Sequence, residues 1–422
     1  MTEPTTDRAL PGGPHKPPHP SVYLLLFMPY GAAGGYVTVT LAYMLTKAGA
    51  SVAQVATLVA LSILPSTYKV LWAPLADTTL TPKIWYRISV IVTVLGFLAF
   101  AVMPYTVALL PVFGVVIFAM NTTSTFSAMS VERLMAYDTP PSQKGRAGGW
   151  AQAGNLGGTG LGGGVGLVIA QHSSHAWLPA ITLALLSLGC MLGLRGLSDP
   201  AHEVQGGYLT VLKTAAKDVW SLMITRLGLL AAVLVLLPVG TGAASNLWAA
   251  IAGDWGASGD EVALIGGGLS GVVCIIGSVA GGYLCDRMDR KLAYLLFGLG
   301  TAAAAVAMAM GPRTALAFIV FATIYNLILG FVYGGFSAVA LEAIGKGAAA
   351  TKYNMLASLS NIPILAMTAL DGWAQGRWGS GGMLVFEASL GVAGAVAFAV
   401  IVYSTRGLTW RGVFGGLLPK PA

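Results

Sequence analysis

Long apolar stretches follow one another along almost the whole chain, and polar residues gather in the short intervals between them. A helix needs about 20 mostly apolar residues to cross the hydrocarbon core of a bilayer, so each stretch predicts one crossing helix. The first six predicted helices are 21–46, 52–75, 84–104, 106–130, 147–171 and 176–197. The second six are 227–251, 260–284, 291–310, 314–342, 352–376 and 382–405. The pattern therefore predicts an all-α membrane protein with twelve transmembrane helices in two six-helix bundles.

The longest polar interval separates the two sets of helices. Its sequence predicts an amphipathic helix on the membrane surface, with Leu209, Leu212, Val219 and Leu222 against Lys213, Lys217 and Asp218. The N-terminal segment contains PGGPHKPPHP, which is too rich in proline to form a helix and too polar to insert, and it predicts a disordered tail. The predicted parts are a cytosolic tail (1–20), an N-terminal bundle (21–197), a cytosolic linker (198–226), a C-terminal bundle (227–405) and a second cytosolic tail (406–422).

The composition agrees with a bilayer environment. Hydrophobic residues make up 56% of the chain and charged residues only 9%, whereas soluble domains carry about 25% charged residues. The net charge of +7 does not predict nucleic-acid binding, because the basic residues are scattered between apolar stretches. They predict topology instead, since lysine and arginine are retained on the cytoplasmic side. With both termini in the cytosol, only Lys47, Arg313 and Arg377 of the 23 basic residues fall on the outer side.

Several classes of function are disfavoured. The cysteines, Cys190, Cys274 and Cys285, lie far apart and form neither a zinc-binding spacing nor a disulfide framework. No Walker sequence, HExxH motif or Ser/His/Asp constellation is visible, so neither an enzyme nor a bound cofactor is expected. The GTGLGG segment from Gly158 fits GxGxxG by letter but lies inside an apolar helix. We interpret its glycines, with the neighbouring ones at the same spacing, as a close-packing face for another helix; they are Gly154, Gly158, Gly162 and Gly166.

The two halves of the chain repeat each other. Four short segments recur in the same order, and the pairs are PYG from Pro29 with PVG from Pro238, LADT from Leu75 with LCDR from Leu284, FSAMSVE from Phe126 with FSAVALE from Phe336, and AQAGNLG from Ala151 with ASLSNIP from Ala357. The repeat sets Asp77 opposite Asp286, and Glu132 opposite Glu342. Repeated bundles of this kind are common in transporters.

One repeated segment resembles a family motif. GGYLCDRMDRK, from Gly281, is similar to the loop motif G-x-L-x-D-R-x-G-R-K of the major facilitator superfamily, with Asp289 in place of the second glycine. The first-half copy, APLADTTLTPK, keeps Leu75 and Asp77 but lacks the arginine after the aspartate. The resemblance covers about 21–405. It implies a secondary transporter that works by alternating access, with the substrate bound near mid-membrane between the halves.

The resemblance also implies a gate at the cytosolic end. Asp77 would face the start of helix 11, near Thr351 and Lys352, and Asp286 the start of helix 5, near Arg146. A carboxylate there meets unpaired N–H groups and partial positive charge, which is worth about 0.3–1 kcal/mol when exposed. The alternative is that both aspartates are ordinary loop charges.

Other charged residues join the candidate gate. Glu132 and Glu342 stand at the cytosolic ends of helices 4 and 10 and could form salt bridges with Arg133, Arg146 or Lys352, or could be independent surface charges. The predicted gate set is Asp77, Asp286, Arg287, Arg290, Glu132, Glu342 and Arg146.

Three segments resemble one branch of the superfamily, the AmpG-like permeases or peptide and acetyl-coenzyme A transporters. They are WAPLAD after Lys69, GRAGGWAQAGNLGGTGLGGG from Gly145 and TKYNMLASLSNIP from Thr351. The resemblance implies proton-coupled import of an anhydromuropeptide, acetyl-coenzyme A or a siderophore. It also implies a monomer in a bacterial inner membrane, whose partners are a small-molecule substrate, protons and the lipid bilayer, with no nucleic acid. An efflux antiporter and a non-transporting membrane sensor are the alternatives.

Polar residues at mid-depth are the candidates for binding the substrate, because amides facing hydrocarbon would stay unsatisfied. Gln152 and Asn155 share one face of helix 5. Lys69 either extends toward the cytosolic interface or projects into the cavity toward a carboxylate or phosphate. The other candidates are Asn121, Asn246, Asn326 and Asn361, with Tyr36 and Trp248 as stacking partners for sugar or base rings. All could instead make hydrogen bonds between helices.

Two acidic residues fall inside predicted spans. Asp371 lies in helix 11 and Glu387 in helix 12, each one to two turns from the external end. Charges in this position are costly, so both are candidates for proton coupling. Asp371 could alternatively pair with Arg377 or lie at a solvated rim, and Glu387 could be structural, because helix 12 is usually peripheral in the superfamily.

Overall fold

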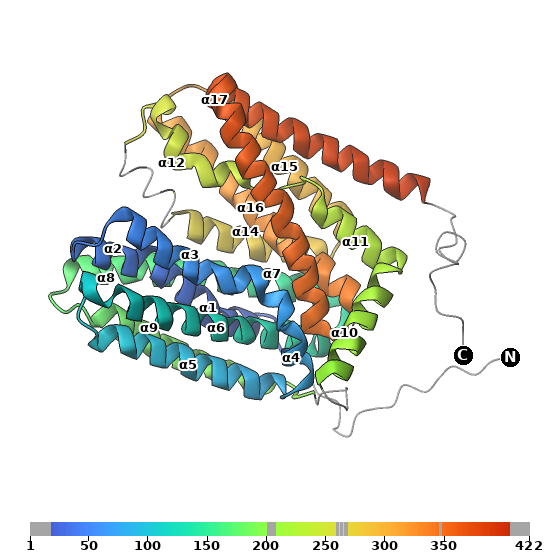
Figure 1. Ribbon diagram of the computed structural model, residues 1–422. Helices are drawn as coiled ribbons and strands as arrows, with labels where there is room; N and C mark the ends of the chain where they lie inside the picture. The colour runs from blue at the N-terminus through green and yellow to red at the C-terminus, as the bar shows by residue number, and fades with distance from the viewer. Residues whose placement is uncertain are drawn as a thin grey trace.

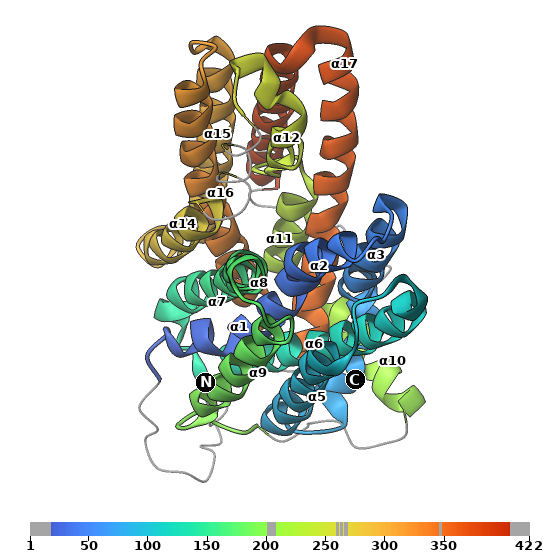
Figure 2. The same cartoon turned by 90° about the vertical axis from the view of Figure 1, so that its left-hand side faces the viewer.

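The computed structural model describes residues 18–200, 208–258, 261, 265, 269–345 and 348–405. All regular elements in these ranges are helical. The helices of the N-terminal half form one block and those of the C-terminal half a second block, and the linker helix α10 lies at one end of both (Figure 1). Figure 2 shows the two blocks in contact through α7, α14 and α17. Residues 1–17 and 406–422, which hold most of the predicted tails, lie outside the described residues.

The N-terminal half contains six rod-like segments. They are α1 (Val22–Gly35), η1 (Tyr36–Leu41) and α2 (Ala42–Lys47); α3 (Val52–Tyr68), η2 (Lys69–Leu71) and α4 (Ala73–Thr78); α5 (Pro82–Val102); η3 (Val107–Leu109) and α6 (Leu110–Asp138); α7 (Lys144–Gly160), η5 (Leu161–Val165) and α8 (Gly166–His172); and α9 (Leu178–Cys190) with η6 (Met191–Leu194). Five of the six start and end within about three residues of a stretch predicted from the apolar pattern, whereas α6 continues to Asp138, eight residues beyond the predicted end at 130.

The linker helix α10 (Tyr208–Met223) precedes the C-terminal half. The next segments are α11 (Arg226–Leu236), η7 (Ala243–Leu247), α12 (Trp248–Ile251) and η8 (Ala252–Trp255); α14 (Ser270–Cys285); α15 (Arg290–Met310); and α16 (Ala315–Ile344). The last element, α17 (Ala349–Ser404), is two helices joined at Gly379, which has a φ of 68°. Among the described residues, six helices are long and apolar enough to cross a membrane by length and composition, one of them being the two-helix element α17. Three shorter apolar helices are found beside them.

The predicted helix 227–251 is wrong in its middle, because the helix is broken there. Residues 237–242, which we call the unwound segment, separate α11 from η7. Pro238 has no N–H to continue the helical hydrogen bonds. Gly240 and Gly242 adopt φ values of 64° and 69°, in the left-handed region that is open mainly to glycine. The PVGTG sequence contained this signal within an otherwise apolar stretch.

Glycines allow α7 to touch helices of both halves. A Cβ on Gly154, Gly158 or Gly162 would lie 2.2 Å from a backbone oxygen of the helix-1 segment, which confirms the predicted close-packing face. On another side of α7, a Cβ on Gly145 or Gly149 would lie 2.4 Å from a backbone oxygen of α14. Helix α7 therefore packs backbone to backbone against α1 in its own half and against α14 in the other.

Candidate functional site

Asp77 joins the end of α4 to the start of α17 in the opposite half. Its Oδ1 accepts a hydrogen bond from the Ala350 amide at 3.1 Å, and its Oδ2 accepts from the Thr351 amide and the Thr351 hydroxyl, both at 2.8 Å. These are the amides of the first turn of α17, which have no acceptor inside their own helix. The Asp77 carboxylate therefore caps a helix that belongs to the other half.

The end of α4 is itself held in place. Arg133 of α6 donates from Nη1 to the carbonyls of Ala76 at 3.1 Å and Leu80 at 3.3 Å. Burial raises the pKa of Asp77 above its ordinary value, while the hydrogen bonds from Thr351 and the charge of Arg133 act in the opposite direction. The hydrogen bonds thus offset a desolvation cost, so the net free energy of this contact is smaller than its bond count implies.

Asp286 makes the equivalent contact from the C-terminal half. Its carboxylate accepts from the amides of Gly145 at 2.8 Å and Arg146 at 3.0 Å, at the start of α7. The Arg146 Nε adds a charge-assisted bond of 3.0 Å, and Arg290 lies 3.3 Å from the other oxygen. We call the contacts of Asp77 and Asp286 the two latches. They lie at the same end of the bundles, here called the gate end.

The structure corrects the partners predicted for Glu132. Its carboxylate is buried and lies 3.8 Å from Lys69 Nζ, rather than against Arg133, Arg146 or Lys352. Asn354, from α17 in the opposite half, donates its amide to the other Glu132 oxygen. Glu132 thus connects Lys69 of η2 with Asn354 of α17. Asn354 lies about one helical turn further along α17 than Thr351, which binds Asp77.

The remaining predicted gate residues differ in burial. Glu342 pairs with Lys291 at 3.3 Å and Arg290 at 3.9 Å, all within the C-terminal half. Arg287 is exposed. Lys144, which was not predicted, donates to the Leu341 carbonyl across the halves at 2.6 Å.

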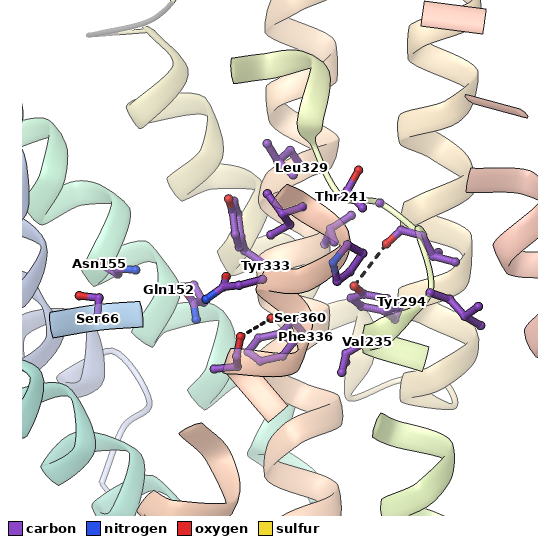
Figure 3. A pocket seen from close by; sticks show the side chains of 18 of the residues that line it. Ser66, Gln152, Asn155, Val235, Thr241, Tyr294, Leu329, Tyr333, Phe336 and Ser360 are labelled. Carbon is purple, nitrogen blue, oxygen red and sulfur yellow. Dashed lines mark hydrogen bonds between the residues drawn. The ribbon is translucent and has the colours of Figure 1, made fainter. Parts of the chain in front are cut away.

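A cavity of about 200 Å³ lies between the halves, behind the latches. Gln152 and Asn155 project from α7 on one side, and Tyr333 and Ser360 from the C-terminal half on the other (Figure 3). Residues at equivalent positions of the two repeats line this cavity. One pair is Asn155 and Asn361, and the other is Tyr30 and Val239. The duplicated chain thus places equivalent segments on opposite walls of one cavity.

Lys69 is the one charged residue among the described residues that line this cavity. It occupies η2, a short 3₁₀ turn that precedes the proline of WAPLAD. Lys69 lines the cavity, and its ammonium group lies 3.8 Å from the Glu132 carboxylate. This position agrees with the second of the two orientations predicted for Lys69, projection into the cavity.

Five predicted binding residues lie away from this cavity. Tyr36 is buried between Phe97 and Phe100, and Trp248 packs edge-on against Tyr325. The side-chain amides of the other three, Asn121, Asn246 and Asn326, donate to Ile117 O, Thr368 Oγ1 and Ser270 Oγ. Their contacts are those of helix packing, which was the alternative interpretation of each.

The cavity wall also contains residues that the sequence did not single out. Tyr294 lines it and donates its hydroxyl to Val239 O at 3.3 Å, and Tyr30 bonds to Ser66 at 3.1 Å. Thr241 lines it from the unwound segment. The repeated motif, Pro-Tyr-Gly from Pro29 and Pro-Val-Gly from Pro238, was the sequence signal for these wall residues. Proline and glycine predict irregular backbone, which at membrane depth is tolerated where it lines a cavity.

Asp371 and Glu387 are both buried in the C-terminal half. Glu387 accepts hydrogen bonds from the Ala244 amide at 3.2 Å and the Tyr325 hydroxyl at 2.8 Å. Arg377, the alternative partner of Asp371, lies over the Trp373 ring at 5.4 Å from its centroid.

The comparisons with known proteins agree with this architecture. Residues 23–365 match the family model described as Major Facilitator Superfamily. No curated protein sequence gives a significant match. Among solved structures, the human organic anion transporter MFSD10 (TETRAN) superposes with a TM-score of 0.67 at 13% identity, covering 91% of this chain and 100% of its own. The Escherichia coli fucose:proton symporter FucP gives 0.64 at 15% identity, covering 92% and 98%. The proton:xylose symporter XylE gives 0.60 at 14% identity, covering 89% and 94%. At these identities the structures show the shared fold alone.

Proposed function

Because the chain belongs to the major facilitator superfamily, we propose that it is a secondary transporter that imports a polar, anionic solute together with protons. The observation that carries this proposal is the position of Lys69, which faces the central cavity and also pairs with Glu132 behind the Asp77 latch. An anionic group on the solute would attract the Lys69 ammonium, while the amides of Gln152, Asn155 and Asn361 would bind polar groups.

The gate end is the cytosolic end in this proposal. The basic residues of the two latches and their surroundings lie there, as the retention of lysine and arginine on the cytoplasmic side requires. Both latches are closed, which in this proposal makes the conformation one that is shut toward the cytosol. Breaking the latches would let the halves rock apart at the gate end and open the cavity toward the cytosol.

The size of the cavity bears on the solute. Its volume of about 200 Å³ is below the 300–1,000 Å³ of common small-molecule sites. An anhydromuropeptide, acetyl-coenzyme A or a ferric siderophore, the solutes implied by the AmpG-like resemblance, would therefore require the halves to separate further. The carboxylates of an anhydromuropeptide and the phosphates of acetyl-coenzyme A are anions that could pair with Lys69.

Proton coupling and a bacterial inner membrane complete the proposal. The fucose and xylose symporters share the fold and use protons, and MFSD10 transports organic anions, which supports an anionic solute and symport by analogy of architecture. A single chain contains both halves and the whole cavity, so a monomer suffices. An efflux antiporter would use the same fold with the opposite direction of flux.

Solute binding is the direct test. Purified protein is screened by thermal shift with an anhydromuropeptide, acetyl-coenzyme A and a ferric siderophore, since a ligand that binds the folded state raises the unfolding temperature. The ligand that stabilises the protein is then followed into proteoliposomes with an imposed pH gradient. Loss of binding in Lys69→Met, with binding retained in the exposed control Lys213→Met, supports the proposal. Equal binding by both variants contradicts an anion site at Lys69. An uptake rate that does not change with the imposed pH gradient contradicts symport.

A further inference from the structure

Two carboxyl groups occupy the interior of the C-terminal half, away from the central cavity. Asp371 lies in the first helix of α17 and Glu387 in the second, on either side of the break at Gly379. Asp371 is 0% exposed and Glu387 7% exposed. They are close enough for the charge of Glu387 to act on Asp371, and Tyr325 of α16 interacts with both.

The surroundings of the pair contain no positive charge among the described residues with which they interact. Glu387 faces Tyr325 and, from α15, the uncharged Gly298, Thr301 and Ala302. Tyr333 is the next titratable group, beyond Tyr325. The two basic residues of the C-terminal half that were predicted on the outer side both lie over aromatic rings, Arg313 over Trp255 and Arg377 over Trp373. Two buried carboxylates without a cation cannot both carry a charge at low cost.

The two groups differ in their hydrogen bonds. Glu387 Oε1 accepts from the Ala244 amide and the Tyr325 hydroxyl, donors that stabilise a carboxylate anion. Neither oxygen of Asp371 has a hydrogen-bond partner among the described residues, although both are fully buried. When two carboxyl groups have such different environments, the one with donors keeps the charge and the other takes the proton.

We propose that Asp371 is a proton-binding carboxyl group, and that Glu387, held as an anion, transmits the gain or loss of that proton to the unwound segment. Binding converts the Asp371 carboxylate and one proton into a neutral carboxyl group, and release regenerates a negative charge next to Glu387. Repulsion between the two anions then acts on the bonds that Glu387 makes to Ala244 and Tyr325. Ala244 belongs to η7, directly after the unwound segment.

The unwound segment connects this site with the central cavity. A space of about 10 Å³ beside Glu387 is lined by Gly240, Thr241 and Gly242. Gly240 and Thr241 also line the central cavity. One short piece of chain therefore has the solute cavity on one side and Glu387 on the other, so a displacement caused by proton release changes the wall of the cavity. The role of this connection in transport rests on the proposed symport. The binding of a proton by Asp371 does not.

A route for the proton lies next to η7. Asn246 is exposed and donates to Thr368, which precedes Asp371 by three residues and so lies on the same face of the helix. Both helices of α17 contact η7, the first through Thr368 and the second through Glu387. The polar pair Asn246 and Thr368 thus joins an exposed side chain to the helix face that carries Asp371.

Infrared difference spectroscopy of the purified full-length protein, titrated between acidic and alkaline pH, tests the site directly. The wild type is expected to show the carbonyl band of a buried protonated carboxyl group that disappears as pH rises. Asp371→Asn removes this band, Asp371→Glu shifts its frequency, and the exposed control Asp289→Asn leaves it unchanged. A band that persists unaltered in both Asp371 variants overturns the proposal, even if one variant folds poorly.

Transmission is tested at the unwound segment. The native cysteines are buried, so Thr241→Cys provides one reporter for a water-soluble maleimide. Its labelling rate, corrected for the ionisation of the thiol, is expected to change at least severalfold across the pH range of the infrared transition, and Glu387→Gln abolishes this change while keeping the band. A pH-independent rate in the Glu387-containing protein overturns the transmission. Uptake without proton dependence would instead end the symport proposal and leave the Asp371 site standing.

Discussion

Asp77 and Asp286 stand in the same relationship to the opposite half of the molecule. Each carboxylate accepts the first free amides of a helix across the interface, Asp77 from Ala350 and Thr351, and Asp286 from Gly145 and Arg146. Each contact uses the partial positive charge of a helix N-terminus, which favours an anion. The two latches therefore close one end of the cavity with polar contacts that need little apolar burial and can be broken and remade.

Removing one latch is expected to loosen the helix that it caps. Asp77→Ala leaves the first amides of α17 without their acceptor, at a cost of about 1 kcal/mol, or roughly a fivefold rise in the open population. Amide hydrogen exchange of residues 349–354, followed by mass spectrometry, is expected to accelerate accordingly. The exposed Asp289→Ala serves as the control, and equal exchange in the two variants would argue against capping by Asp77.

The glycine contact between α7 and α14 is expected to be required for the closed state. In Gly145→Ala the new Cβ would lie 2.4 Å from Gly282 O and 2.7 Å from Asp286 Oδ1, so the helices must separate. Gly164→Ala is the matched control, because no atom lies within 4 Å of its Cβ. Spin labels at Ser142 and Met288, which are both exposed and on opposite halves, report the separation by pulsed electron paramagnetic resonance. A longer distance is expected in Gly145→Ala alone.

The buried pair of Lys69 and Glu132 is expected to be strongly coupled. Lys69→Met leaves the Glu132 carboxylate without its cation and costs about 3–5 kcal/mol. The double variant Lys69→Met, Glu132→Gln removes both charges and is expected to recover most of this loss. A double-mutant cycle from denaturant unfolding measures the coupling. Additive effects of the two substitutions would show that the 3.8 Å contact contributes little.

Gly242 of the unwound segment and Gly256, directly after η8, are two left-handed glycines that can be compared. Gly242 has a φ of 69°, and a Cβ there would lie 2.5 Å from Leu329 Cδ1; Gly256 has a φ of 66°, with no atom within 4 Å. Gly242→Ala combines backbone strain with overpacking, whereas Gly256→Ala carries the strain alone. The thermal unfolding temperature is expected to fall by several degrees more for Gly242→Ala. Similar losses in both variants would mean that the packing of Leu329 adapts freely.

The sequence predicted those features that depend on one-dimensional patterns. Apolar length gave the helices, and the repeat of LADT and LCDR pointed to Asp77 and Asp286 as equivalent residues. The glycine spacing from Gly154 correctly predicted a close-packed face, because glycine leaves room for a neighbouring backbone whatever that neighbour is.

Features that depend on which side chains of other helices lie nearby were harder to predict. Glu132 pairs with Lys69 and Asn354 because three helices converge there, and nothing in the local sequence distinguishes these partners from Arg133 or Lys352. Tyr36 and Trp248 were predicted to contact the solute, but aromatic residues fill cores as readily as binding sites. The break in helix 7 was signalled by PVGTG, yet the apolar residues on both sides favoured an unbroken helix.

The most direct test of the account is the distance between spin labels at Ser142 and Met288 in the double variant Asp77→Ala, Asp286→Ala. The account predicts a distribution that moves to longer distances at the gate end, because both caps are lost and the two halves separate there. A distribution identical to that of the wild type would contradict the claim that the two aspartates hold the cavity closed.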